Sequence, residues 1–170
     1  MHSIDLNCDL GESFGAYTIG LDETVTPHVT SVNIACGWHA GDPLVMERTV
    51  ALAKQCGVAI GAHPGFPDLL GFGRRELKVS PDEVYSYVKY QIGALYAFAR
   101  SHHMELQHMK AHGSLYNMAG KDIRLAEAMC RACRDFDSQL ILLALAGSKM
   151  EEAAQQMGVP CAREFFADRA

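Results

Sequence analysis

Four polar clusters contain most of the side chains in this 170-residue chain that could perform chemistry, and each follows a short apolar run. Carboxylates and imidazoles transfer protons and bind metal ions, and a lysine in a pocket stabilises negative charge. Their repetition after separate runs predicts one composite site. The clusters are DLNCDLGE at 5–12, CGWHAGDP at 36–43, GAHPGFPD at 61–68 and KAHGSLYN at 110–117.

The first cluster supplies two carboxylates, Asp9 and Glu12, that are close in the sequence. When two carboxylates are crowded together, the pKa of one of them rises, which gives a general acid or base near neutral pH. Asp5 lies further back in the apolar run, where a catalytic carboxylate and a buried hydrogen-bond anchor are both open interpretations. We therefore expect Asp9 and Glu12 to be the catalytic carboxylates.

Three histidines, His39, His63 and His112, each follow a different apolar run. We expect them to be catalytic and to lie near Asp9. Two histidines and a carboxylate also form a metal-binding set, so Asp9, His39 and His63 are candidate ligands, or three histidines if His112 joins. A loop histidine that only makes hydrogen bonds is the simpler alternative, and metal binding stays open. The histidines without such a context are His2, His28, His102, His103 and His108.

The fourth cluster contains Lys110, which is predicted to face the protein interior, where a lysine without a role is costly. We expect it to be catalytic, by stabilising an oxyanion or binding a carboxylate or phosphate. The turn GFGRR at 71–75 could hold a phosphate through Arg74 and Arg75, or be a glycine turn with solvated arginines. No GxxxxGK[ST] loop occurs, so ATP would bind unconventionally or on another chain.

The elements that must position these clusters alternate between strand and helix. Helices are predicted from Asp42 and Pro43 to Gly57, from the capping sequence at 80–83 onward, over about 122–135 and over 149–157. The alternation is typical of parallel βα units. Strands are predicted near 4–9, 31–36, 58–62, 106–111, 139–145 and 160–166.

Side-chain alternation within these strands decides between two α/β architectures. In the first strand the even-numbered positions are apolar, whereas Asp5, Asn7 and Asp9 point to the other face. An open doubly wound sheet would be apolar on both faces, so a (β/α) TIM-like barrel with a polar interior explains the pattern better. The interior residues and arginines predicted to bind substrate or phosphate are Asn7, Asn33, Arg74, Arg75, Glu164 and Asp168.

Composition predicts a single domain over residues 1–170, with 49% apolar residues and a net charge of -5. No basic stripe favours nucleic acid, and no apolar window of about twenty residues favours a membrane span. The start lacks the pattern of a secretory signal and the six cysteines are scattered, so a cytoplasmic location is expected. Six strands do not close a barrel, and we therefore expect a C-terminal portion to be absent from this chain.

An ordered series of longer motifs resembles the LamB/YcsF family, and the resemblance covers nearly the whole chain. It implies a seven-stranded, deacetylase-like barrel and the A subunit of a 5-oxoprolinase, which converts 5-oxo-L-proline to L-glutamate with subunits B and C. It also implies ATP and Mg²⁺, bound together with those partners. The motifs are DLNCDLGE at 5–12, NIACGWHAGDP at 33–43, GVAIGAHPGFPD at 57–68, FGRR at 72–75, YQIGAL at 90–95, KAHGSLYN at 110–117 and EFFADRA at 164–170.

Two other functions remain open from the residues themselves. A metal-dependent deacetylase or amidohydrolase acting alone would use His39, His63 and Asp9. A non-catalytic subunit would bind 5-oxoproline or a partner protein without turning it over.

Overall fold

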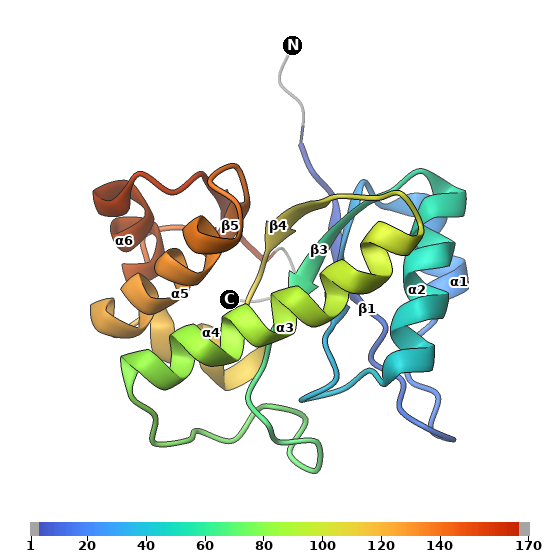
Figure 1. Ribbon diagram of the computed structural model, residues 1–170, viewed down its shortest axis with the longest axis horizontal. Coiled ribbons are helices and arrows are strands. Elements are labelled where there is room, and N and C mark those ends of the chain that lie inside the picture. The colour runs from blue at the N-terminus through green and yellow to red at the C-terminus, as the bar shows by residue number, and fades with distance from the viewer. Residues whose placement is uncertain (1–3, 167–170) are drawn as a thin grey trace.

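The computed structural model describes residues 4–166 and has a parallel six-stranded sheet at its centre. The strands follow one another across the sheet in chain order, and the sheet curls into part of a TIM-like barrel (Figure 1). This confirms the predicted α/β barrel architecture. The strands are β1 (Asn7–Leu10), β2 (Ser31–Ala35), β3 (Ala59–His63), β4 (Leu106–Met109), β5 (Ile141–Leu145) and β6 (Cys161–Glu164).

Four longer helices connect these strands, and all four were predicted from the sequence. Asp42 caps the first of them by accepting hydrogen bonds from the amides of Leu44 and Val45, at 2.8 and 2.9 Å. Gly57 ends the same helix in the left-handed conformation, with φ of 68°. The helices are α2 (Pro43–Cys56), α3 (Pro81–Ser101), α5 (Ile123–Phe136) and α6 (Lys149–Met157), and neighbouring ones pack together outside the sheet (Figure 1).

Three short elements were not predicted, because they are too short to produce a helical repeat of apolar residues. They are α1 (Asp22–Val25), the 3₁₀ helix η1 (Thr26–His28) and α4 (Gly113–Ala119). The start of α4 touches the 71–75 turn, where the amide of Ser114 donates to the carbonyl of Gly73 at 2.9 Å. A Cβ on Gly113 would lie 2.6 Å from that carbonyl oxygen, so the close approach of the two loops requires glycine here.

The two faces of the sheet differ as the alternation predicts. Val32 and Ile34 of β2 are fully buried in the apolar core, whereas Asn33 between them faces the polar interior. Asn7 pairs in register with Ser31, and Asp9 with Asn33, so polar side chains form adjacent rows on the inner face. Among the described residues, no helix is both long and apolar enough to cross a membrane.

Candidate functional site

The residues predicted to share one end of the barrel do so. Asp9 Oδ1 lies 3.5 Å from His63 Nε2 and 3.4 Å from Lys110 Nζ, although Asp9 and Lys110 are 101 positions apart. His39 reaches the same place through Glu12, with 3.3 Å between His39 Nε2 and Glu12 Oε1. Parallel strands bring these groups together because each cluster follows the carboxyl end of its strand. A cavity of about 410 Å³ opens beside them.

His63 and His112 each use one ring nitrogen to contact a backbone carbonyl. His63 Nδ1 donates to the carbonyl of Lys110 at 2.8 Å, and His112 Nε2 donates to that of Phe72 at 2.8 Å. The remaining nitrogens, His63 Nε2 and His112 Nδ1, face each other at 3.0 Å. In two neutral rings both would be lone pairs, so this contact requires a shared proton or a bound cation.

His39 and Glu12 complete this group around His112. The rings of His39 and His112 are stacked with centroids 3.7 Å apart, and Glu12 Oε1 lies 3.5 Å from His112 Nδ1. His39 is fully buried, and its Nδ1 has no hydrogen-bond partner among the described residues. A Cβ on Gly65 would lie 2.6 Å from that nitrogen, so glycine at 65 makes room for the imidazole.

The donor set that fits a metal ion differs in part from the predicted one. One potential ligand atom from each of Glu12, His39, His63 and His112 lies within 4.8 Å of the others. Nitrogens that share a tetrahedral zinc at about 2.0–2.1 Å are roughly 3.4 Å apart, which is near the separation of His63 and His112. Asp9 is adjacent to His63 but is not part of this group. The residues therefore fit a cation through the three histidines, the alternative set given by the sequence, with Glu12 rather than Asp9 as the carboxylate.

The two carboxylates have different proton affinities. Desolvation alone would raise the pKa of Asp9, but the His63 imidazole, Lys110 and Asn33 outweigh it and hold that pKa well below its usual range. Burial raises the pKa of Glu12, which His63 and His112 only partly offset. Asp9 therefore stays ionised while Glu12 can exchange a proton, as expected for crowded acids with separated roles.

The three imidazoles also differ in pKa. Burial opposes a charge on His63, but Asp9 outweighs it and raises the pKa of His63. Burial, together with His63, lowers the pKa of His39 to about 2. Burial and the two neighbouring histidines lower that of His112 to about 3. Without a bound cation, His63 is thus the member of the trio that holds an additional proton, and its Nε2 then donates to His112 or Asp9.

Lys110 is buried between two carboxylates. Its Nζ lies 3.4 Å from Asp9 Oδ1 and 3.2 Å from Glu164 Oε2. The hydroxyl of Tyr116 donates to Glu164 Oε1 at 2.8 Å, which fixes the carboxylate. The ammonium also lies 5.1 Å from the centre of the Phe166 ring. Glu164 therefore orients Lys110 toward the cavity.

The remaining residues predicted to bind substrate or phosphate do not all lie at the cavity. Arg74 lines the cavity, whereas Arg75 forms an ion pair with Asp68 and is not among the described residues that line it. The structure thus gives Arg75 a role in holding the turn. Asn7 and Asn33 lie in the interior beneath Asp9. Asp168 lies outside the described residues.

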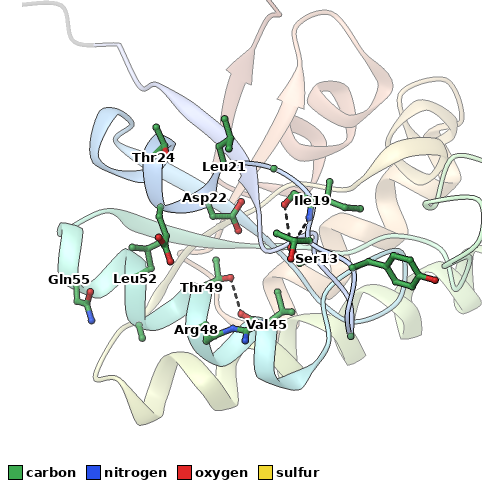
Figure 2. A pocket seen from close by; sticks show the side chains of 16 residues that line it. Ser13, Ile19, Leu21, Asp22, Thr24, Val45, Arg48, Thr49, Leu52 and Gln55 are labelled. Atoms are coloured by element: carbon green, nitrogen blue, oxygen red, sulfur yellow. Dashed lines mark hydrogen bonds between the residues drawn. The ribbon is translucent and has the colours of Figure 1, made fainter.

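A larger cavity lies away from this site. It has a volume of about 930 Å³ and is formed by the 13–24 segment and α2 (Figure 2). Two of its hydroxyls have local partners: Thr49 donates to the carbonyl of Val45 at 2.9 Å, and Ser13 accepts from the amide of Ile19 at 3.0 Å. None of the predicted site residues that the structure describes lines the larger cavity, whereas Asp9, His63 and Lys110 line the smaller cavity, which is therefore the candidate active site.

Comparison with known proteins identifies the family of this chain. The model of the LamB/YcsF family matches residues 4–170. The chain belongs to the LamB/YcsF family. The crystal structure of a lactam utilization protein from Thermus thermophilus is 49% identical to this LamB/YcsF chain, with a TM-score of 0.98 over 99% of this chain and 68% of that one.

Curated relatives of this LamB/YcsF chain have a common name. The 5-oxoprolinase A subunit from Clostridium beijerinckii is 61% identical over 170 residues, which are 100% of this chain and 67% of the relative. Its counterpart from Geobacillus thermodenitrificans is 62% identical over 169 residues, or 99% of this chain and 66% of the relative. The chain thus spans about two thirds of the length of the curated relatives it matches.

Proposed function

We propose that this chain is the A subunit of a 5-oxoprolinase and takes part in the ATP-dependent opening of 5-oxo-L-proline to L-glutamate. The observation that carries the proposal is the cluster beside the cavity. There Glu12, with a raised pKa, contacts His39 and His112, while the ionised Asp9 lies 3.4 Å from the buried Lys110. These groups suit the attack of water on an amide carbon whose oxygen gains negative charge. The names of the relatives and of the solved neighbour supply the substrate class, a lactam.

The chemistry of the substrate explains a need for ATP. A five-membered lactam re-forms easily, because its amine and acid are held on one chain. Transfer of the γ-phosphoryl group to the lactam oxygen would activate the ring carbon. One water would then open the ring to an acyl phosphate, and a second would release glutamate and phosphate. We place ATP and Mg²⁺ at a site shared with partner subunits B and C, in the cytoplasm.

The residues of this chain have distinct proposed roles. Glu12 takes a proton from the attacking water, and protonated His63 supplies a proton to the departing ring nitrogen. Lys110, oriented by Asp9 and Glu164, stabilises the anionic oxygen or the phosphate. His112 and His39 hold Glu12 and His63 in position, through contacts of 3.0 to 3.5 Å. Arg74, at the cavity, binds the carboxylate of the substrate.

An assay for glutamate release tests this function. The protein is mixed with subunits B and C, 5-oxoproline, ATP and magnesium, and we expect glutamate and ADP to form in equal amounts. Omission of any one of the three proteins should abolish release. Glutamate release without ATP, or the absence of release from the complete mixture, would contradict the proposal.

A second candidate function is hydrolysis that depends on a bound metal. It is favoured by the facing nitrogens of His63 and His112 and by the donor set that they form with Glu12 and His39. These four residues would hold a cation such as Zn²⁺, which, when bound, would supply an activated water. The carbonyls of Lys110 and Phe72 would fix the two ring orientations.

Metal analysis separates the two functions. Under the main proposal we expect the purified protein to retain ATP-coupled turnover after treatment with a zinc chelator and restoration of magnesium. A stoichiometric transition metal, together with turnover lost to the chelator and restored by that metal without ATP, would favour the metal-dependent hydrolase. His112→Gln should then lower metal affinity by tenfold or more, a change that equilibrium dialysis would detect.

A further inference from the structure

A buried histidine outside the catalytic cluster, His108, lies on the inner face of β4. It is two positions before Lys110 and 1% exposed. Its ring lies against the backbone of β3, where a Cβ on Gly61 would come within 2.2 Å of His108 Cδ2. Any larger residue at 61 would displace the imidazole, so the barrel interior has a defined space for this ring.

A directed chain of hydrogen bonds leads from His108 to the site. His108 Nε2 lies 2.7 Å from Asn33 Oδ1, and Asn33 Nδ2 donates to Asp9 Oδ1 at 2.8 Å. Asn7 Nδ2 donates to the same oxygen of Asn33 at 3.1 Å. Because an amide oxygen can only accept, the hydrogen of this contact must be on His108 Nε2.

The direction of this chain matters for Asp9. If the Asn33 amide were rotated by half a turn, its oxygen would face the Asp9 carboxylate, and two acceptors would repel each other. Two donors, Nε2–H of His108 and Nδ2 of Asn7, bind the oxygen of Asn33 and so disfavour this rotation. Asn33 Nδ2 also donates to Asn7 Oδ1. Asn7 therefore exchanges hydrogen bonds with Asn33 in both directions, whereas His108 binds only the oxygen of Asn33.

Burial keeps His108 in its neutral form. Burial lowers the pKa of His108 to about 4; the Asp5 carboxylate opposes this effect, and the charges of His63 and Lys110 add to it. A neutral imidazole carries a single hydrogen, and both nitrogens face an oxygen: Nε2 lies 2.7 Å from Oδ1 of buried Asn33, and Nδ1 lies 3.2 Å from Oε1 of exposed Gln107. The exposed Gln107 amide can rotate to offer its NH₂ group to Nδ1, so the Asn33 contact sets the tautomer. The His108 ring thus donates one hydrogen bond, from Nε2 to the Asn33 oxygen.

We propose that His108 is a positioning residue for this site: through Asn33 it fixes the hydrogen bond that holds Asp9 toward His63 and Lys110. The expected effect of His108 on turnover rests on the proposed function. The hydrogen bonds by which His108 and Asn33 hold Asp9 do not depend on it. Among the described residues, His108 is neither one of those that line the cavity nor one of the four potential metal ligands, and its side-chain hydrogen bonds are to Asn33 and Gln107. Its action is therefore transmitted through the Asn33 amide.

Two substitutions of His108 separate positioning from packing. His108→Leu keeps a similar volume without a donor, whereas the amide of His108→Gln can reach the position of Nε2 and donate to Asn33. In the glutamate-release assay we expect His108→Leu to lower kcat by about tenfold to a hundredfold with KM changed less than about threefold, because a hydrogen bond to a charged network is lost. His108→Gln should recover to within about threefold of the wild-type kcat.

Nuclear magnetic resonance tests the same inference without activity. In wild-type protein we expect the Nε2–H tautomer of His108 and slow hydrogen exchange of the Asn33 side-chain amide, retained in His108→Gln and lost in His108→Leu. His102→Leu and His102→Gln are matched controls, since His102 pairs with Glu47 away from the site. An Nδ1–H tautomer, or equal kcat in the Leu and Gln variants, would overturn the inference. If wild-type protein released no glutamate, the proposed function would fail and the resonance data would still decide the role of His108.

Discussion

Lys110→Met in the protein assayed with its partner subunits should lower ATP-coupled glutamate release by about a hundredfold or more, the scale on which preorganised charged groups act. The ammonium lies between Asp9 and Glu164 at 3.4 and 3.2 Å, and no other lysine lines the cavity in the described part of the chain. Methionine retains most of the stem, so the apolar packing of the side chain is preserved. Steady-state kinetics with 5-oxoproline as the varied substrate measure the effect.

The matched control for this change is Lys149→Met. Lys149 forms an exposed pair with Glu152 on α6, so its loss should leave turnover within about twofold of wild type. Circular dichroism on both variants checks that they fold. A folded Lys110→Met protein with near-normal turnover would remove Lys110 from the mechanism.

Glu12→Gln should reduce kcat by about a hundredfold to ten-thousandfold, the usual contribution of a general base. Glutamine has nearly the same shape and can still contact His39, but it cannot accept a proton. KM for 5-oxoproline should change little, because the substituted group is needed for proton transfer rather than for binding. A purely binding role for this chain predicts the opposite pattern, with weaker binding and unchanged kcat.

The same variant should alter the pH dependence of the reaction. Burial raises the pKa of Glu12, so in wild-type protein the fraction of ionised base, and with it kcat, rises as the pH increases through that pKa. Glu12→Gln should lack this rise. Glu127→Gln, an exposed position on α5, is the control and should keep the wild-type profile. A rise with pH that persists unchanged in Glu12→Gln would assign the base to another group.

The architecture could be predicted largely from local sequence. Caps such as Asp42 and Ser80 determine where helices begin, because they satisfy amides that are otherwise unpaired within the first turn. The period-two pattern of the strands separates an apolar face from a polar one, and this alone distinguishes a barrel from an open sheet. The same alternation also placed Asp9 and Lys110 at one site.

His108 shows where that reasoning was incomplete. Its position two residues before Lys110 places it on the inner face by the same alternation, yet it lies outside the four polar clusters, which alone do not indicate a role for it. Its partner Asn33 is 75 positions away, so no short motif connects them. The available signal was strand parity, together with the glycine at 61 on the neighbouring strand.

The sequence by itself determined the order of strands and helices, the polar inner face and the shared position of the clusters, because caps and strand parity act between near neighbours. Only the tertiary structure decided which groups are in contact. Glu12 lies with the three histidines, Asp9 lies next to that group, and Arg75 forms an ion pair with Asp68. Ring orientation, hydrogen-bond direction and pKa depend on distances of a few ångströms between residues far apart in the chain. Those distances are set by how the strands and loops pack together, which residue spacing along the chain does not specify.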